Sequence, residues 1–368
     1  MSAGNPFRYQ GPVHPSALID RRRELDILQR AAADRVAIRL AAPRRYGKTS
    51  LLDAHVEAMR AAGHRAVRVD FSKVASVGDA TARVAEAFRV LPADPHRTVG
   101  RWTARLGISV GGLSLQPAPR PLRGESEETR RALLELLDVP RVLHEGDREL
   151  TVVCLDEFQD LLVADDALDG LVRSVIQHHG DAAAYVYAGS QPSLMRTLFA
   201  DRERPFYGQA RPLELPGLPA AEAAQDVEAL LEAGGIRAGA AVHELLAFSA
   251  GHPQRTMLLA HHLYDLLDRG EAGDDPAREA LHLALAETRD AHQAVWDGLG
   301  RVERLVLLAV ADRRAPTGTR VAAEHRVARS TLQHAVDRLL GDEQHLRRRA
   351  EGGVELVDPL LAEWLRRR

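Results

Sequence analysis

One short segment constrains the fold of this 368-residue chain more than any other: residues 36–52, with the sequence VAIRLAAPRRYGKTSLL. Residues 36–41 form a short apolar run with β-branched side chains, Pro43 interrupts the chain, and a helical pattern opens at Gly47. A strand, a tight loop and a helix in this order aim successive backbone N–H groups and the positive end of a helix at one point, which suits phosphate oxygens. The segment therefore predicts a phosphate-binding loop.

The residue types in this loop indicate which phosphates it binds. Gly47, Lys48 and Thr49 match the second half of the pattern G-x-x-x-x-G-K-[ST], in which the lysine reaches the β- and γ-phosphates and the hydroxyl holds Mg²⁺. Ala42 replaces the first glycine of the pattern, which keeps the side chain small but gives up easy access to positive φ. Lysine is otherwise present only at position 73 in a chain with 49 lysines and arginines, so a compact, flexible ammonium has been kept at position 48. The expected nucleotide-binding residues are Pro43, Arg44, Arg45, Tyr46, Gly47, Lys48, Thr49 and Ser50.

A second motif lies where another buried strand is expected to end. Residues 150–155, LTVVCL, are a continuous apolar run that leads directly into Asp156 and Glu157. Because buried parallel strands present their carboxyl ends to a ligand, Asp156 can reach Mg²⁺, directly or through water, and Glu157 can polarise an attacking water. A strand that ends in two acids is common by itself. Together with the phosphate-binding loop it predicts ATP hydrolysis, in which Lys48 and Mg²⁺ stabilise charge in the transition state.

Further strand ends supply less specific candidates. The strand expected at 185–188 leads into Ser190, whose hydroxyl could bond the γ-phosphate or the water, or could cap the next helix. Arg204 and Arg211 precede or open the last expected strand, where an arginine supplied across a subunit contact could stabilise the transition state. Surface arginines are the alternative at both positions. Upstream of the loop, Arg21–Arg23 could contribute adenine contacts or form the solvated start of a helix.

Beyond residue 218 the sequence pattern changes from alternating strands and helices to helices alone. Alanine- and leucine-rich helical segments continue to about residue 297, separated by breaks that contain glycine and proline. From residue 299 three short helical segments are followed by two short strands around Gly352 and Gly353, an order typical of a winged helix-turn-helix. We therefore expect an N-terminal segment at 1–33, an ATPase core at 34–217 with a hairpin insertion near 106–115, a helical domain at 218–298 and a winged helix at 299–368.

Composition narrows the class of protein. A hydrophobic content of 45% and a charged content of 27% are those of a globular protein. The net charge of −3 gives no general attraction for nucleic acid or acidic membranes, so any such contact must come from a local patch. Cys154, the only cysteine, lies in an apolar run and is expected to be a small buried hydrophobe. Without an apolar run of membrane-spanning length or a signal segment at the start, we expect a cytoplasmic protein.

Six segments carry a resemblance to a known family: PRRYGKTSLL (43–52), LDEF (155–158), AGS (188–190), PFYG (205–208), GHP (251–253) and VDPLLAEWL (357–365). In these motifs and their order the chain resembles the archaeal-type AAA ATPases, relatives of the STAND signalling NTPases and of the origin-recognition initiators. The resemblance implies an α/β fold with a P-loop NTPase αβα core and a parallel sheet, a helical lid and a C-terminal winged helix. It also implies that Pro253 packs near the nucleotide, that Arg255 could be a second sensor, and that Arg211 lies where AAA relatives keep an arginine finger.

The leading functional hypothesis is an ATPase whose bound ATP or ADP sets the positions of the lid and the winged helix. ATP is favoured over GTP because the only asparagine is Asn5, so no N-K-x-D guanine-reading motif exists. On this hypothesis the protein acts on double-stranded DNA in replication, transposition or a mobile element. Arginines outnumber acidic residues 14 to 10 in residues 299–368, a slight positive bias. The expected DNA contacts are Arg329, Gln333, His334, Arg338, Arg347, Arg348 and Arg349.

A regulatory switch is the alternative from a different class. Such a protein would bind nucleotide nearly irreversibly, change its homo-oligomeric state with the nucleotide and recruit a protein partner in stress or defence signalling. The third helix of the winged helix would then pack against the lid or a protein rather than DNA. Slow turnover would favour the switch, and salt-sensitive binding to duplex DNA would favour the DNA hypothesis.

Overall fold

The computed structural model describes residues 4–91, 127–341, 345–349 and 352–368, which separate into two compact units. The sheet unit comprises Arg21–Arg44 and Lys48–Leu215. The helical unit comprises Met1–Asp20, Arg45–Gly47 and Pro216–Arg368. The hairpin insertion expected near 106–115 lies outside the described residues, and the four-part division of the chain remains a prediction.

A five-stranded parallel sheet forms the centre of the sheet unit, with the strand order β2-β3-β4-β1-β5. Every residue of β3 and β4 is buried, which is why their sequences are continuous apolar runs rather than alternating ones. Cys154 lies in β3 and is buried with a free thiol. The strands are β1 (Ile38–Ala41), β2 (Arg65–Asp70), β3 (Thr151–Asp156), β4 (Ala183–Gly189) and β5 (Arg211–Glu214).

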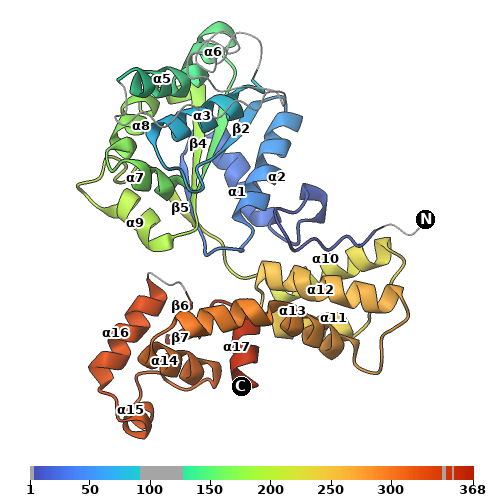
Figure 1. The fold of residues 1–368 in the computed structure, drawn as a ribbon. Helices are drawn as coiled ribbons and strands as arrows, with labels where there is room; N and C mark the ends of the chain where they lie inside the picture. Colours follow the sequence, from blue (N-terminus) through green and yellow to red (C-terminus); the bar gives the residue numbers. More distant parts are fainter. Residues whose placement is uncertain (1–3, 92–126, 342–344, 350–351) are drawn as a thin grey trace, which may run out of the picture. The chain divides into compact units, whose positions relative to one another are not determined.

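Helices cover both faces of this sheet (Figure 1). Crossovers between parallel strands are right-handed, and the step from β1 to β2 runs in the opposite direction from the steps β2 to β3 to β4. The helix after β1 and the helix after β2 therefore lie on opposite faces. Helices α3, α5, α8 and α9 share one hydrophobic core with the sheet. The helices of this unit are α1 (Arg22–Ala33), α2 (Lys48–Ala61), α3 (Val77–Phe88), α5 (Glu127–Leu137), α6 (Val139–Asp147), α7 (Leu161–Ala164), α8 (Leu168–Ile176) and α9 (Pro192–Ala200).

The helical unit contains the helices and the short hairpin that the sequence predicts after residue 218. Four helices come first: α10 (Ala220–Ala233), α11 (Ala241–Ser249), α12 (Pro253–Asp268) and α13 (Pro276–Gly298). Three shorter helices, α14 (Arg301–Ala311), α15 (Thr319–His325) and α16 (Arg329–Leu340), precede an antiparallel pair of strands, β6 (Leu346–Arg348) and β7 (Val354–Leu356). The last helix is α17 (Pro359–Arg366).

The N-terminal segment is part of the core of the helical unit. Phe7 is fully buried and its ring packs edge-on against Tyr264 of α12, with 6.3 Å between the centroids. The Asn5 amide donates to the His261 carbonyl at 3.0 Å and to Asp265 at 2.7 Å. Residues 4–20 therefore belong with the helical unit, whereas α1, which follows them in the chain, belongs with the sheet unit.

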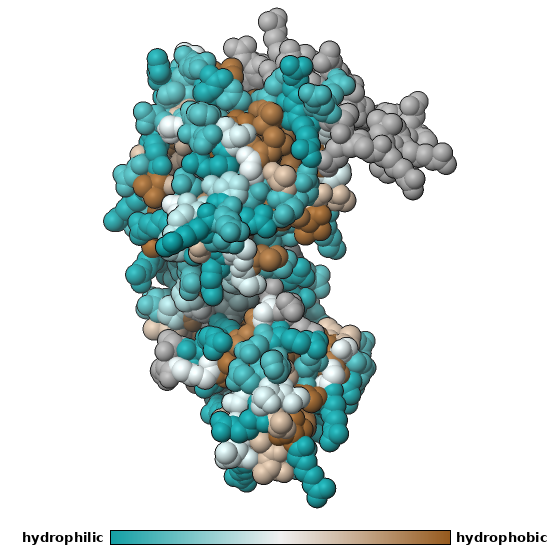
Figure 2. All heavy atoms as spheres, turned by 90° about the vertical axis from the view of Figure 1, so that its left-hand side faces the viewer, coloured by the Kyte–Doolittle hydropathy of each residue, from teal (hydrophilic) through white to brown (hydrophobic). Residues whose placement is uncertain are grey.

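Hydrophobic residues form small separate patches among hydrophilic ones on the face of the molecule that Figure 2 shows. The large hydrophobic side chains that remain exposed in the described residues are Val36, Val90, Val142, Val163, Leu194, Tyr207 and Leu283. Within the described part of the chain, no helix combines the length and the apolar character that a membrane crossing requires.

His55 on α2 makes the stability of the sheet unit depend on pH. Its side chain is fully buried, and neither ring nitrogen has a hydrogen-bond partner among the residues that the structure describes. Burial lowers its pKa to about 4. The histidine is neutral when folded, whereas the unfolded chain binds a proton below about pH 6.5. The unfolded state therefore binds more protons between pH 6.5 and 4, and stability falls as the pH falls through this window, by on the order of 3 kcal/mol in total.

We expect His55→Leu to remove this part of the acid destabilisation. Urea unfolding of wild type and variant between pH 4 and 7, followed by circular dichroism, measures the effect. The free energy of unfolding of the variant should fall less than that of the wild type between pH 6.5 and 4. Some slope remains because burial also lowers the pKa of His179 in the sheet unit and of His252 in the helical unit. An unchanged slope in the variant contradicts the assignment to His55.

Candidate nucleotide-binding site

The predicted phosphate-binding loop connects β1 to α2. Gly47, the last residue before α2, has a φ of 82°, a conformation that suits glycine. Ala42, which stands in place of the first glycine of the motif, does not adopt a positive φ. Its N–H donates to the Gly189 carbonyl at 3.3 Å and so continues the pairing of β1 with β4. Alanine is tolerated at this position because the backbone there does not need the freedom of glycine.

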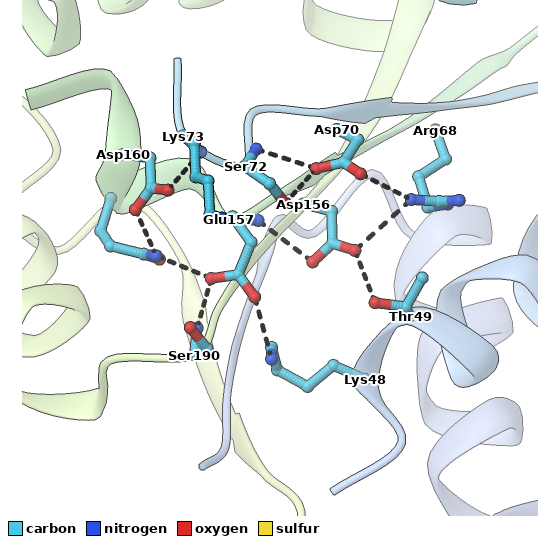
Figure 3. Close-up of polar contacts among 11 residues, drawn as sticks. Lys48, Thr49, Arg68, Asp70, Ser72, Lys73, Asp156, Glu157, Asp160 and Ser190 are labelled. Carbon is cyan, nitrogen blue, oxygen red and sulfur yellow. Dashed lines mark hydrogen bonds and ion pairs between the residues drawn. The ribbon is translucent and has the colours of Figure 1, made fainter. Parts of the chain in front are cut away.

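Lys48 and Thr49, the first two residues of α2, contact the two acids at the end of β3 (Figure 3). Lys48 is only 5% exposed, and its Nζ lies 3.3 Å from Glu157 Oε1. The Thr49 hydroxyl donates to Asp156 Oδ2 at 2.9 Å. The phosphate-binding motif and the two acids therefore meet at the carboxyl ends of β1 and β3, two parallel strands of one sheet with β4 between them.

Asp156 is a buried carboxylate that lies beside a hydroxyl group and could bind a cation. It is 2% exposed, and burial raises its pKa against the opposing effects of Lys48 and the Thr49 hydroxyl. A carboxylate beside a hydroxyl is an oxygen donor set of the kind that Mg²⁺ takes. The residues present therefore fit the predicted magnesium site.

Glu157 is ionised and held by several donors. Burial alone would raise its pKa, but the Lys48 charge and hydrogen bonds from Ser190 and Gln159 outweigh burial and lower the pKa. The backbone of Glu157 adopts φ 50° and ψ 43°, a left-handed conformation that is costly for a residue other than glycine and is found preferentially at functional sites.

Ser190 lies in the site, where its side chain and its backbone both hydrogen-bond Glu157. It is 2% exposed, and its N–H donates to Glu157 Oε2 at 3.0 Å (Figure 3). The alternative role for Ser190 as a helix cap is wrong, because α9 begins at Pro192 and its N-cap residue is Gln191.

Comparison with solved structures identifies the architecture. The Walker-type ATPase PABY2304 of Pyrococcus abyssi superposes with a TM-score of 0.70 at 16% identity, over 98% of this chain and 99% of that chain. The chain has the P-loop ATPase fold. The ORC2 protein of Aeropyrum pernix, in ADPNP–ADP complexes, gives 0.58 at 14% identity over 97% and 94% of the two chains. The ORC1 protein of the same organism, in complex with DNA, gives 0.50 at 18% identity over 95% and 92%.

These neighbours confirm the predicted P-loop core and, at the level of fold, the resemblance to archaeal-type AAA ATPases. No family model and no curated protein sequence matches the chain.

The predicted arginine finger lies at the edge of the P-loop sheet. Arg211 is exposed on the edge strand β5, where its backbone N–H donates to the Ala37 carbonyl. Arg204 is engaged by two acids, Asp166 at 3.0 Å and Asp169 at 3.5 Å.

Arg21 is not the solvated start of a helix. It is 2% exposed, has a φ of 76° and pairs with Glu24 at 3.1 Å. The solvated alternative is therefore wrong for this residue, and a buried ion pair fixes the entry to α1.

Several predicted residues of the nucleotide site lie in the helical unit. Tyr46 belongs to this unit and is 1% exposed. Its ring packs edge-on against that of His252, with 5.0 Å between the centroids. Its hydroxyl also contacts the Arg347 guanidinium. Pro253 lies in the first turn of α12, for which His252 is the N-cap. Arg255, the predicted second sensor, is 3% exposed and forms a two-pronged ion pair with Asp358.

Arg68 is a site residue that no sequence motif predicts. It projects from β2, with Nη1 3.5 Å from Asp156 Oδ2 and Nε 2.7 Å from Asp53 Oδ1. In the register of the sheet, Asp70 on the same strand lies beside Asp156. The only sequence signal is that the polar residues Arg68 and Asp70 lie in a strand, and its use requires knowing that β2 pairs with β3 and in which register.

Proposed function

We propose that the chain binds ATP together with Mg²⁺ and hydrolyses it to ADP and phosphate. One observation carries this proposal: the lysine and hydroxyl that open α2 meet both acids at the end of β3, at 3.3 Å for Lys48–Glu157 and 2.9 Å for Thr49–Asp156. A helix start that can bind phosphate, a lysine, a metal-binding pair and a carboxylate base are the parts that phosphoryl transfer to water requires.

The phosphates would lie at the N-terminal end of α2, where backbone N–H groups and Lys48 offer positive charge. Thr49 and Asp156 would hold Mg²⁺, which when bound supplies further positive charge to phosphate oxygens. A water oxygen attacks the γ-phosphorus, the bond from that phosphorus to the β–γ bridging oxygen breaks, and ADP leaves with the electron pair. Glu157 takes the proton from the water, and its lowered pKa keeps it ionised at neutral pH.

We further propose that ATP and ADP favour different positions of the lid, α10–α13, and of the winged helix, α14–α16 with β6 and β7, and that the winged helix contacts duplex DNA. The order of three helices and a two-stranded hairpin supports the assignment of a winged helix. The structure of the ORC1 neighbour in complex with DNA supports the choice of partner. Of the predicted contacts, Arg347 is half-buried and the others are exposed: Arg329, Gln333, His334, Arg338, Arg348 and Arg349.

One observation favours the alternative, a slow nucleotide switch that recruits a protein. Three of the predicted DNA contacts already pair with acids in the same unit: Arg338 with Glu303 at 2.9 Å, and Arg347 and Arg349 with Glu355 at 2.6 and 3.0 Å. These pairs leave less positive charge for phosphates. They involve exposed or half-exposed arginines and are weak enough for DNA to displace them.

Steady-state ATP turnover across a titration of random-sequence duplex DNA distinguishes the two functions. If the protein acts on DNA, we expect turnover to rise several-fold and the stimulation to decline steeply with salt. Glu157→Gln is the blank, since it should remove both basal and stimulated turnover. Turnover that stays low and indifferent to DNA contradicts the DNA proposal and favours the switch.

A further inference from the structure

Gln159 donates to the carboxylate that we assign as the base. This residue lies in the short 3₁₀ turn Phe158–Asp160 directly after Glu157. Its Nε2 donates to Glu157 Oε2 at 2.7 Å, and the Ser190 N–H donates to the same oxygen at 3.0 Å. Lys48 instead contacts Oε1. The two oxygens of Glu157 therefore have different partners.

The burial of Gln159 costs folding free energy. This residue is 1% exposed, and its Oε1 is buried without a hydrogen-bond partner in the described part of the chain. An unsatisfied buried amide oxygen costs free energy that an apolar side chain of similar size would avoid. The end of β4 is also shaped around this amide, because a Cβ added at Gly189 would lie 2.3 Å from Gln159 Oε1. Stability alone does not account for glutamine at this position.

Asp160 fixes the other side of the Gln159 amide. The Nε2 group also donates to Asp160 Oδ1 at 2.9 Å, and Asp160 Oδ2 accepts from the Lys73 N–H at 2.8 Å (Figure 3). Lys73 lies in the turn after β2 with a φ of 56°. A continuous chain of hydrogen bonds therefore connects this turn to Glu157.

We propose that Gln159 is a positioning residue for ATP hydrolysis: together with the Ser190 N–H it anchors Glu157 Oε2, so that Oε1 is the oxygen that accepts the proton of the attacking water. The inference rests on the proposed function. When Lys48 turns to the phosphates it releases Oε1, while Oε2 keeps both of its donors. Asp160 holds the Gln159 amide in the orientation that this arrangement requires. An anchored carboxylate is ready for proton transfer, whereas a free one samples unproductive rotamers.

The test compares Gln159→Met with the wild type in steady-state ATP hydrolysis. Methionine keeps the length and the volume of the side chain but removes both N–H donors. We expect kcat to fall roughly 10- to 100-fold, with KM for ATP and the thermal midpoint little changed. Asp160→Asn, a milder change at a half-buried position, should lower kcat by a smaller factor. Gln177→Met is the matched control, because Gln177 is exposed and distant in sequence from both motifs.

A double variant separates positioning from a purely structural role. If Gln159 acts through Glu157, adding Gln159→Met to Glu157→Gln should leave the residual single-turnover rate unchanged, since the group to be positioned is already gone. An unchanged kcat in Gln159→Met, or an equal further loss in the double variant, overturns the inference. If Glu157→Gln itself hydrolyses ATP like the wild type, the proposed function fails instead.

Discussion

Replacing Glu157 by glutamine is expected to slow ATP hydrolysis by roughly 10²- to 10⁴-fold while the protein still binds ATP. The amide keeps the shape of the side chain but cannot take a proton from water. It also releases Lys48 from the 3.3 Å contact with the Glu157 carboxylate, so the lysine remains available for phosphates. Phosphate release measures the loss of turnover, and the fluorescence of a labelled ATP analogue measures binding.

Glu149→Gln is a suitable control for this experiment. Glu149 is an exposed residue just before β3, so it lies at the opposite end of this strand from Glu157. The substitution removes the same negative charge as Glu157→Gln. The control should hydrolyse ATP at the wild-type rate. Equal losses in both variants would mean that net charge rather than a base is responsible.

The second large effect concerns stability. Asp358→Ala is expected to destabilise the helical unit by about 3–5 kcal/mol, because Arg255 would become a buried charge without its partner. Arg255 is 3% exposed and donates to both oxygens of Asp358, and His292 lies 3.4 Å from the same carboxylate. The substitution also removes the N-cap of α17, since Asp358 Oδ1 accepts from the Leu360 N–H at 3.0 Å.

Chemical unfolding followed by tryptophan fluorescence measures this loss, because Trp296 and Trp364 belong to the helical unit. Asp275→Ala is the matched control: Asp275 caps α13 and pairs with Arg278, but at the exposed surface. Asp275→Ala should lower the free energy of unfolding far less than Asp358→Ala does. Similar losses in the two variants would show that capping, and not the buried ion pair, stabilises this unit.

Much of the fold follows from local patterns in the sequence. The run LTVVCL is a strand because it is apolar throughout, and the strand ends at Asp156 because Glu157 adopts a left-handed conformation that starts a 3₁₀ turn. The parallel arrangement then brings strand ends together, which is why Lys48 and Glu157 could be assigned to one site although 109 residues separate them. The glycine and proline breaks in the second half likewise predict where α10–α13 begin and end.

Other features depend on pairings that no local pattern encodes. Arg255 and Asp358 are 103 residues apart, and only the packing of α12 against the start of α17 brings them together. Arg68 enters the site because β2 pairs with β3 in one particular register. Ser190 also contributes its N–H to the site, a donor that no local pattern reveals. Gln159 contacts Glu157 through a short 3₁₀ turn whose geometry the motif does not reveal.

The central claim is that Lys48, Thr49, Asp156 and Glu157 form a site that hydrolyses ATP. Its most direct test is phosphate release from ATP in the presence of Mg²⁺ by the wild-type chain and by Glu157→Gln, purified side by side and matched for ATP binding. The account predicts a turnover that the variant loses almost completely. Equal turnover in the two proteins would contradict it.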